Sequence, residues 1–392
     1  MNYLSNDNYF AKIYKKNQFL IFFQSFSSIR GRFLYFYNIY NLFTNMQKIQ
    51  TALLSYGMSG KVFHAPFLNV HPGFELVGSW ERSQTNIQKD YPNVQSFNSL
   101  ESILNNPSID LIVVNTPVAT HFDYAQEALL AGKHVVVEKA FTATLEQAKI
   151  LQRLAFEKKL KLAVFQNRRW DSDFLTVQSI VNQGVLGELV EAEFHFDRYN
   201  PNLSPKIHKE TSNDGAGILK DLGPHLIDQA LCLFGMPERV FAHIRKTRNL
   251  TLVDDHIDIF LYYKSLTVRL KASFFIKEPS ASYILHGKKG SFLKPRADVQ
   301  EEQLKTGQKP NLTTWGTEPI AASGYLNTEI DGKSIAENVE SKQGNYYHFY
   351  DLLYKSITQN REEPVTSDDG VRVMTIIEKA IESQELQKVV YI

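Results

Sequence analysis

Short apolar runs alternate with amphipathic stretches between Ile49 and Asn167. Runs such as 110–114 are almost wholly apolar, which is typical of parallel strands covered by helices on both faces. Segments such as 121–132 and 143–159 repeat their apolar residues with a helical period. This regular alternation of strand and helix predicts a doubly wound parallel sheet.

After Asn167 the pattern changes to longer runs that alternate apolar and polar positions and are separated by tight turns. Such runs predict an antiparallel sheet with one face covered. They lie at 190–199, 238–247, 256–264, 266–275 and 282–287. The polar stretch 294–344 is interpreted as a surface excursion. Two helices are expected at 346–359 and 367–386, the second with a favourable Thr-Ser-Asp-Asp start.

The predicted fold class is therefore α/β, with an N-terminal Rossmann domain at 46–168 and a C-terminal α+β domain at 169–392. The second domain carries a mostly antiparallel sheet, and its last helix is a candidate to pack back on the first domain. Residues 1–45 do not conform, because they are rich in aromatic residues and asparagine and hold almost no acids. Three interpretations compete for them: a secretory signal, a membrane anchor, or a misassigned start ahead of Met46. Their apolar runs are too short for the first two, which favours the third.

The composition fits a soluble two-domain protein: 392 residues, a net charge of +1 and 43% hydrophobic residues. The balanced charge argues against nucleic acid as a partner. A single cysteine, Cys232, excludes an intrachain disulfide and suggests the cytoplasm. Because it lies in an apolar run, Cys232 is interpreted as core packing.

The stretch LSYGMSGKVFH resembles a dinucleotide-binding turn in which Ser55 replaces the first glycine of GxGxxG. Gly57 and Gly60 hold the places that allow close pyrophosphate approach and close helix packing. Serine in place of the first glycine restricts the backbone conformations that the turn can adopt, but it hardly limits the approach of the phosphate. Because the turn joins a strand to a helix, we expect it to bind a nicotinamide dinucleotide, with Met58 and Ser59 in contact.

The residues at the end of the next expected strand should determine whether the protein prefers NAD or NADP. Glu81 could accept hydrogen bonds from a ribose 2′-hydroxyl, which favours NAD, whereas Arg82 could pair with a 2′-phosphate, which favours NADP. We predict NADP, with Arg82 and Ser83 on the phosphate and Glu81 turned aside. NAD stays the alternative.

Four strings in order, GMSGKVFHAPF, NTPVATHFDYAQEALLAGKHVVVEKA, QNRRWDSDF and GILKDLGPHLIDQALCLFG, resemble the Gfo/Idh/MocA oxidoreductases. The resemblance covers essentially 46–392 and is strongest to the branch of NADP-dependent scyllo-inositol dehydrogenases. It implies a nicotinamide-binding Rossmann domain and an open-faced sheet, one side lining the substrate pocket and the other often forming a dimer interface. It also implies three catalytic residues: Lys139 from the family's EKP motif, and Asp221 and His225 from its DxxxH pair. Ala140 replaces the EKP proline, which could loosen the placement of Lys139.

These residue types suit the oxidation of a secondary alcohol. His225 can take the proton from the hydroxyl and return it in the reverse direction. Asp221 can orient the imidazole or hold a neighbouring hydroxyl, and Lys139 can stabilise developing negative charge on oxygen. Asp228, one turn after His225, could form a metal pair in principle, but no further ligands have convincing spacing, so we predict no metal.

Further site residues are expected at strand ends and at the crossover between the domains. The expected cofactor contacts are Thr116, Pro117, His121 and Glu138, and the expected substrate contacts are Asn167, Arg168 and Trp170. A helix cap is an equal alternative for His121, and interdomain ion pairs are an equal alternative for Arg168 and its neighbour Arg169. The cluster 254–256 is interpreted as a solvated strand entry.

The leading hypothesis is an NAD(P)-dependent dehydrogenase of a sugar or cyclic polyol, with scyllo-inositol and its ketone as the sharpest guess. We expect a homodimer or higher homo-oligomer in the cytoplasm, with no membrane partner. Two alternatives stay open: a non-catalytic dinucleotide-binding regulator, and an NAD-dependent glycosidase of the same family. The intact catalytic set argues against the regulator.

Overall fold

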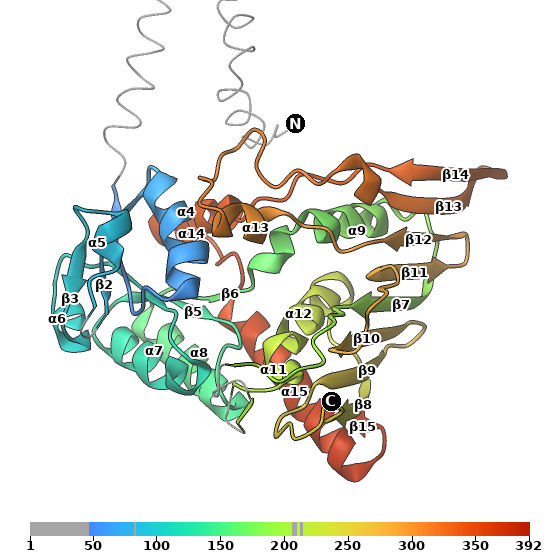
Figure 1. Cartoon of the computed structure of the whole chain (residues 1–392), viewed down its shortest axis with the longest axis horizontal. Coiled ribbons are helices and arrows are strands. Elements are labelled where there is room, and N and C mark those ends of the chain that lie inside the picture. The colour runs from blue at the N-terminus through green and yellow to red at the C-terminus, as the bar shows by residue number, and fades with distance from the viewer. Residues whose placement is uncertain (1–46, 82–83, 206–209, 212–214) are drawn as a thin grey trace, which may run out of the picture.

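The computed structural model describes residues 47–81, 84–205, 210–211 and 215–392. The predictions on 1–45, Arg82 and Ser83 lie outside the described residues. The described chain folds around two sheets that stand side by side, with helices between and around them (Figure 1). No helix in the described part of the chain is long and apolar enough to cross a membrane.

The first sheet is the predicted parallel one and has six strands in the order β3-β2-β1-β4-β5-β6. Its strands are β1 (Ile49–Leu53), β2 (Phe74–Trp80), β3 (Gln95–Phe97), β4 (Leu111–Val114), β5 (His134–Glu138) and β6 (Leu162–Phe165). The π-helical turn η1 (Gly60–His64) leads directly into α4 (Ala65–Val70), and the other helices are α5 (Ile87–Asp90), α6 (Leu100–Leu104), α7 (His121–Leu130) and α8 (Leu145–Lys158). Every residue of β4 is buried, as the apolar run predicts.

The second sheet has nine strands in the order β14-β13-β12-β11-β7-β10-β9-β8-β15. Its strands are β7 (Leu189–His195), β8 (Arg239–Arg245), β9 (His256–Tyr262), β10 (Thr267–Ser273), β11 (Tyr283–Gly287), β12 (Gly290–Lys294), β13 (Gly324–Ile330), β14 (Lys333–Val339) and β15 (Val390–Tyr391). β7 and β10 are parallel, and the other pairs are antiparallel. The predicted fold class is confirmed.

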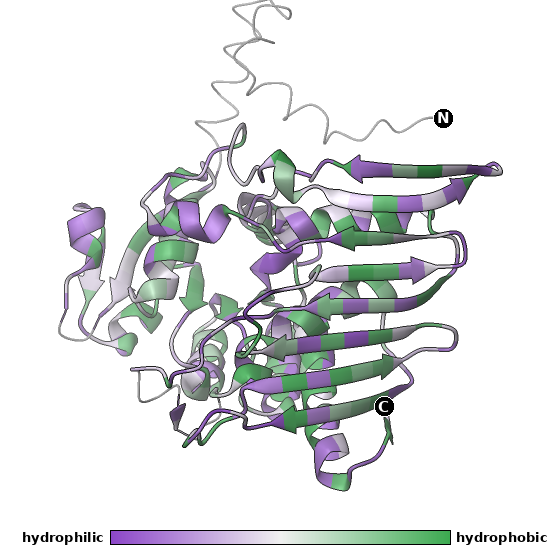
Figure 2. Ribbon diagram, turned by 45° about the vertical axis from the view of Figure 1, so that its right-hand side comes forward, coloured by the Kyte–Doolittle hydropathy of each residue, from purple (hydrophilic) through white to green (hydrophobic). Residues whose placement is uncertain are grey.

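Helices cover one face of this second sheet and leave the other face open (Figure 1). They include α9 (Ser172–Gln183), α11 (Ile218–Asp221), α12 (Gly223–Phe234) and α15 (Ser367–Leu386). Figure 2 shows apolar and polar residues alternating along the strands. In β9 the side chains of Ile257, Ile259 and Leu261 are fully buried, and the residues between them are only half-buried. This alternation is what the sequence pattern predicts for a sheet covered on one side.

The last two helices contact both sheets. α14 (Tyr347–Gln359) packs against α4, where the ring of Tyr350 stacks on Phe67 with centroids 5.8 Å apart. α15 packs against α8 and β6 on one side and against α12 and β8 on the other. It begins where Thr366 forms a bridge to Ala163 of β6, and Thr366 caps it with a reciprocal capping box. The C-terminal segment therefore completes the first sheet as well as the second.

The interpretation of 294–344 as a surface excursion is wrong in part. The segment contains α13 (Gln300–Lys305), the short turn η4 (Ile320–Ala322) and the hairpin β13–β14. Trp315 is buried, and so is the ion pair between Lys294 and Glu318, whose atoms Nζ and Oε2 lie 2.6 Å apart. A buried charge of this kind needs its partner, so the segment is part of the domain's core.

Two smaller interpretations are also wrong. Asp255 is fully buried rather than solvated, and its carboxylate accepts hydrogen bonds from the backbone amides of Thr247 and Arg248. Asp254 accepts from the amide of Leu219 and so fixes the start of α11. Cys232 lies on the exposed face of α12 and does not pack in the core.

Candidate active site

Ser55 holds the first turn after β1 without glycine. Its Oγ accepts a hydrogen bond from the amide of Gly57 at 3.1 Å, and its carbonyl oxygen accepts one from Asn115 Nδ2 at 2.7 Å. Non-glycine residues with positive φ occur in the described chain, but Ser55 is not among them. A side-chain hydrogen bond two residues along the chain therefore replaces the conformational freedom of glycine.

The two remaining glycines have different reasons to be glycine. A Cβ at Gly60 would lie 2.3 Å from the carbonyl oxygen of Ser55 and 2.8 Å from Asn115 Nδ2, so only glycine lets this helix pack so closely on β1 and β4. At Gly57 the only described atom that a Cβ would approach within 4 Å is Ser55 Oγ, at 3.3 Å. The space beyond Gly57 is open, and the first amides of the helix point their hydrogens out of the helix there. This turn fits a dinucleotide pyrophosphate.

Glu138, at the end of β5, links this glycine turn to Lys139, the predicted catalytic lysine. Its Oε1 accepts hydrogen bonds from Ser59 Oγ and, at 3.0 Å, from His64 Nε2, and its Oε2 accepts from the amide of Lys139. The other ring nitrogen of His64 lies 2.7 Å from the hydroxyl of Tyr350 on α14. Burial opposes ionisation of Glu138, but the hydrogen bonds from His64 and Ser59 outweigh it and lower the pKa of this carboxyl. We call these four side chains, Ser59, His64, Glu138 and Tyr350, the Glu138 cluster.

The Glu138 cluster includes two residues that the sequence did not single out. His64 is fully buried, and its signal was its place in the string GMSGKVFHAPF, in which only the glycine turn was assigned. Tyr350 lies on α14, far from the other three residues in sequence. The cofactor contacts predicted for Ser59 and Glu138 stay predictions, and the structure places both residues at the turn.

The side chain of Glu81 faces the start of helix α5. Its two carboxylate oxygens accept hydrogen bonds from the amides of Asn86 and Ile87, each at 3.0 Å, and so cap the start of α5. The orientation agrees with the expectation that Glu81 turns aside, while Arg82 and Ser83 lie outside the described residues.

Thr116 and Pro117 follow β4 at the carboxyl edge of the first sheet, where such folds bind ligands. His121 begins α7 and is buried, with Nδ1 2.9 Å from the carbonyl oxygen of Ala140 and Nε2 2.7 Å from that of Thr116. Its ring thus links the segment after β4 to the segment after β5. A cofactor contact by His121 stays a prediction beside this structural role. Met58, by contrast, is exposed at the start of the glycine-turn helix.

Lys139 and Asp221 meet across the two domains. Lys139 Nζ donates to the backbone carbonyl oxygen of Asp221 at 2.7 Å and to its Oδ1 at 3.0 Å. The Lys139–Ala140 peptide bond is cis. An ammonium group has three hydrogens to donate, and these bonds use two of them. Lys139 is therefore held in place although alanine replaces the proline of the EKP motif.

His225 is the third residue of α12, just after the break that separates α12 from α11, and is only 5% exposed. Its Nδ1 has no hydrogen-bond partner among the described residues. Burial, with the positive charges of Lys139, Arg168, Arg296 and Arg198, lowers the pKa of this histidine well below its ordinary value of 6.5. The ring is therefore neutral near pH 7, the form that accepts a proton.

The segment after β6 forms ion pairs between elements, as one of the two alternatives predicted. Arg168 Nη2 lies 2.8 Å from Glu301 on α13, and Arg169 makes a two-pronged pair with Asp228 on α12 at 2.7 and 2.8 Å. The guanidinium of Arg169 therefore occupies the carboxylate that was considered as a metal ligand. Asn167 is buried, and Trp170 packs edge-on against Phe349 of α14. The substrate contacts of Asn167, Arg168 and Trp170 stay predictions.

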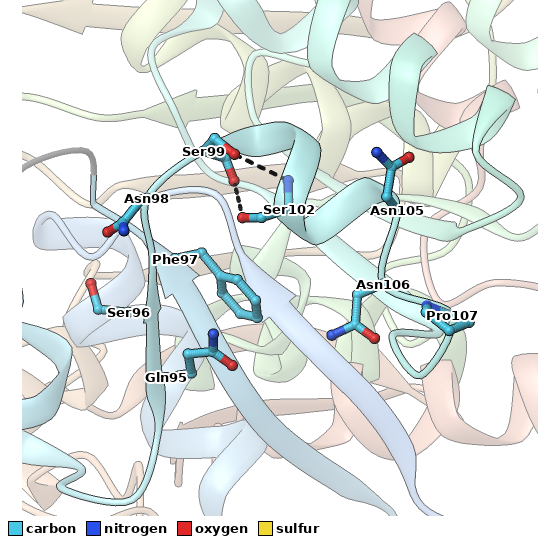
Figure 3. A pocket seen from close by; sticks show the side chains of 9 residues that line it. All are labelled: Gln95, Ser96, Phe97, Asn98, Ser99, Ser102, Asn105, Asn106 and Pro107. Carbon is cyan, nitrogen blue, oxygen red and sulfur yellow. Dashed lines mark hydrogen bonds between the residues drawn. The ribbon is translucent and has the colours of Figure 1, made fainter.

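A cleft of about 880 Å³ separates the carboxyl edge of the first sheet from the second domain. The segment 116–119 lines it on one side, and Arg198, Gly217 and Asp221 are among its residues on the other. Asp221 thus lines the cleft, and Lys139 is bonded to it at 3.0 Å. A second hollow, of about 430 Å³, lies at the outer edge of the first sheet between β3 and α6 (Figure 3). It is lined by none of the predicted site residues, and its Ser99 and Ser102 bond to each other across the first turn of α6.

A Rossmann sheet has a glycine turn after β1 and a lysine after β5, and helices α11 and α12 of the second domain bring an aspartate and a histidine to that lysine. This arrangement defines the class of nicotinamide-dependent dehydrogenases. Residues 49–166 match the family model of the NAD-binding Rossmann fold of an oxidoreductase family, and residues 178–392 match its C-terminal alpha/beta domain. The chain belongs to the Gfo/Idh/MocA oxidoreductase family. It is an enzyme of the dehydrogenase class that acts on CH–OH groups.

Relatives match over nearly their whole length. YdgJ of Escherichia coli, an uncharacterized oxidoreductase, is 39% identical over 86% of this chain and 96% of its own. The scyllo-inositol 2-dehydrogenase (NADP(+)) IolW of Bacillus subtilis is 35% identical over 87% of this chain and 95% of its own. The solved structure of YvaA from Bacillus subtilis has a TM-score of 0.84 at 34% identity and covers 89% of this chain and 99% of its own.

Proposed function

We propose that this enzyme is an NADP-dependent dehydrogenase of a secondary alcohol in a sugar or cyclic polyol. The observation that carries the proposal is the pair Lys139–Asp221, bonded at 2.7 and 3.0 Å across the domains. Beside it lies the buried ring of His225, whose Nδ1 has no hydrogen-bond partner among the described residues. A base, an oriented cation and a cleft at the strand ends are the parts that alcohol oxidation needs.

Each residue has a defined task in this proposal. A nicotinamide, when bound, takes the hydride from the alcohol carbon or returns it to the ketone. His225 accepts the hydroxyl proton, for which its neutral form is ready at pH 7. Lys139 donates its third hydrogen to the reacting oxygen and stabilises the negative charge that develops on it. Asp221 holds the ammonium group in place and can bind a neighbouring hydroxyl.

Glu81 supports the choice of NADP. A carboxylate that bonds a ribose 2′-hydroxyl must face the cofactor, but here both its oxygens bond the start of α5. Arg82 and Ser83, the next residues in the sequence, lie outside the described residues and are the ones proposed to bind a 2′-phosphate. The relative IolW carries NADP(+) in its name.

For the substrate, the inositols are the first compounds to test, because IolW is named for scyllo-inositol. A regulator that binds the dinucleotide without chemistry has no need of the Lys139–Asp221 pair. A glycosidase of the same family would also bind NAD, so only substrate turnover separates it from a dehydrogenase.

The experiment is a spectrophotometric screen at 340 nm with NADP and NAD against inositols, aldoses and their oxidised forms, together with p-nitrophenyl glycosides. We expect reduction of NADP by at least one polyol or sugar and no release of nitrophenol. The dehydrogenase proposal fails if nitrophenol is released or if no compound exchanges hydride in either direction. A lower KM for NAD than for NADP would defeat the cofactor proposal alone.

The open face of the second sheet is the proposed interface of a homodimer. Arg269 on β10 stacks over the ring of Phe260 on β9 at 5.5 Å, and Arg239 on β8 stacks over Tyr262 at 5.4 Å. Apolar rings under guanidinium groups suit a partly polar interface. Light scattering should give twice the monomer mass. The cytoplasmic location likewise stays a prediction, which fractionation of cells can test.

A further inference from the structure

Three arginines surround one phenylalanine beside the proposed base. Phe196 follows β7, and the guanidinium carbons of Arg296, Arg168 and Arg198 lie 4.4, 5.2 and 5.3 Å from the centre of its ring. The ring of His225 lies 6.4 Å from the same centre. We call these arginines and Phe196 the arginine pocket. Three positive charges thus gather beside the group that would take the substrate proton.

The arginines are not equally neutralised. Arg168 is bound to Glu301 at 2.8 Å, and its Nη1 lies 3.3 Å from Asp171. Arg296 Nε donates to the carbonyl oxygen of His195, and the nearest carboxylate oxygen, that of Asp171, is 3.9 Å from Nη1. Burial raises the pKa of Asp171 well above its usual value, which weakens even this distant partner. Arg296 is therefore a cation whose charge is not locally balanced.

The two terminal nitrogens of Arg296 have no hydrogen-bond acceptor in the part of the chain that the structure describes. Both atoms, Nη1 and Nη2, are buried. Arg168 Nε, Gln166 Oε1 and His225 Nδ1 share this condition. Buried polar atoms are nearly always bonded, and leaving a charged one unbonded costs free energy. Atoms left unbonded together at one place are expected where a ligand supplies the missing partners.

We infer that the preferred substrate carries a carboxylate, which Arg296 binds with its two free nitrogens while Arg168 and Arg198 stand on either side. The compound class is an acidic sugar or polyol, such as a uronate, and this inference rests on the proposed function. A guanidinium group matches a carboxylate with two parallel hydrogen bonds. The bound charge would also offset the cations that hold the pKa of His225 low.

Matched substrate pairs test the inference. D-galacturonate and D-galactose differ in a carboxylate against a hydroxymethyl group, as do D-glucuronate and D-glucose, and galactose 6-phosphate carries a dianion instead. We expect kcat/KM with NADP to be about 10- to 100-fold higher for the acid of a pair, the range that a hydrogen-bonded charge provides. Arg296→Gln should reduce the ratio of acid to neutral sugar by a similar factor, and Arg296→Lys by less.

Arg153→Gln is the control, because Arg153 lies on the exposed face of α8, where it pairs with Glu146. It should leave the ratio unchanged. If Arg296→Gln does not fold, Arg198→Gln replaces it, because Arg198 lines the cleft. The inference is overturned if native enzyme prefers the neutral sugar or the phosphate ester, or if the arginine variants leave the ratio unchanged.

Failure of the proposed function gives a different result. If no compound exchanges hydride, binding of galacturonate and galactose is measured by calorimetry on the enzyme with NADP. Tighter binding of galacturonate that Arg296→Gln abolishes would keep the carboxylate site while the dehydrogenase proposal falls. Equal binding of the two sugars would overturn the carboxylate site itself. Turnover of neutral polyols alone would keep the dehydrogenase and remove the carboxylate site.

Discussion

The Glu138 cluster and the arginine pocket differ in how their buried polar atoms are bonded. In the cluster, Ser59, His64 and the amide of Lys139 all donate to one carboxylate, and Tyr350 bonds the far nitrogen of His64. In the pocket, Arg296 and His225 hold atoms without partners in the described chain. The cluster is complete as it stands, whereas the pocket is complete only with a ligand.

This difference separates two kinds of contribution to the enzyme. A fully bonded buried network fixes geometry and adds to the stability of the fold. Unbonded buried donors reduce stability, and proteins keep them where binding or chemistry repays the loss. Changes in the Glu138 cluster should therefore act first on stability, and changes around His225 should act first on turnover.

The largest expected effect comes from His225→Ala. Removing the base should lower kcat by about 10²–10⁴-fold, the usual contribution of acid–base catalysis, with little change in affinity for NADP. Steady-state kinetics and a fluorescence titration of NADPH measure the two quantities. His225→Asn, which fills more of the space, should lose as much activity. An unchanged kcat in both variants would contradict the role of His225.

Glu138→Ala should change stability more than turnover, the reverse of His225→Ala. It removes the common acceptor of Ser59, His64 and the Lys139 amide, so the free energy of unfolding should fall by about 1–3 kcal/mol. Denaturant unfolding measures the loss. We also expect a several-fold higher KM for NADP, because the glycine turn is less firmly held. Glu157→Ala on the exposed face of α8 is the control, and an equal effect of the two variants would show that the cluster adds nothing.

The pH dependence of alcohol oxidation tests the lowered pKa of His225 beside the arginine pocket. Burial and the nearby cations lower the pKa of His225 well below 6.5, so the ring keeps its neutral, proton-accepting form as the pH falls through 6.5. A histidine with an ordinary pKa would lose about tenfold in kcat/KM by one pH unit below that value. We expect no such loss until the pH is lower still. An acid limb centred near 6.5 would refute the shifted pKa.

The smallest effect is expected at Glu81. Glu81→Ala removes the cap of α5 and should cost about 0.5–2 kcal/mol of stability. The ratio of the KM values for NAD and NADP should stay within about twofold, because a carboxylate that faces α5 makes no contact whose loss would favour either cofactor. A marked shift of the ratio toward NADP would mean that Glu81 faces the ribose.

The sequence predicted the regular parts of the fold well. The bounds of α15 match the expected 367–386. Lys139 and Asp221, both named from the family resemblance, are bonded to each other, a contact that was not predicted. Strand β13 was missed because it lies near the sheet edge and is largely polar, so its alternation is weak. The helix α9 did carry a signal, since Phe174, Val177 and Ile180 recur at helical spacing and are buried.

The Glu138 cluster and the arginine pocket could not be predicted in this way. Arg198 follows β7 and Arg296 follows β12, two strands that are not neighbours in the sheet. No local sequence pattern indicates that these two arginines lie near His225 on α12. Likewise Tyr350 reaches His64 only because α14 packs on α4. Local periodicity predicts elements, while the meeting of distant side chains depends on how the two sheets and their shared helices are assembled.

The position of α15 has a consequence for protein engineering. This helix starts against β6 of the first sheet and runs on to β8 of the second, so the end of the polypeptide completes the cofactor half. A chimera that joins the first 168 residues of one family member to the remainder of another would place a foreign helix on β6 and α8. Exchange of substrate specificity between relatives should therefore succeed more often when the interior segment 172–345 is transplanted and α14 and α15 stay with their original Rossmann domain.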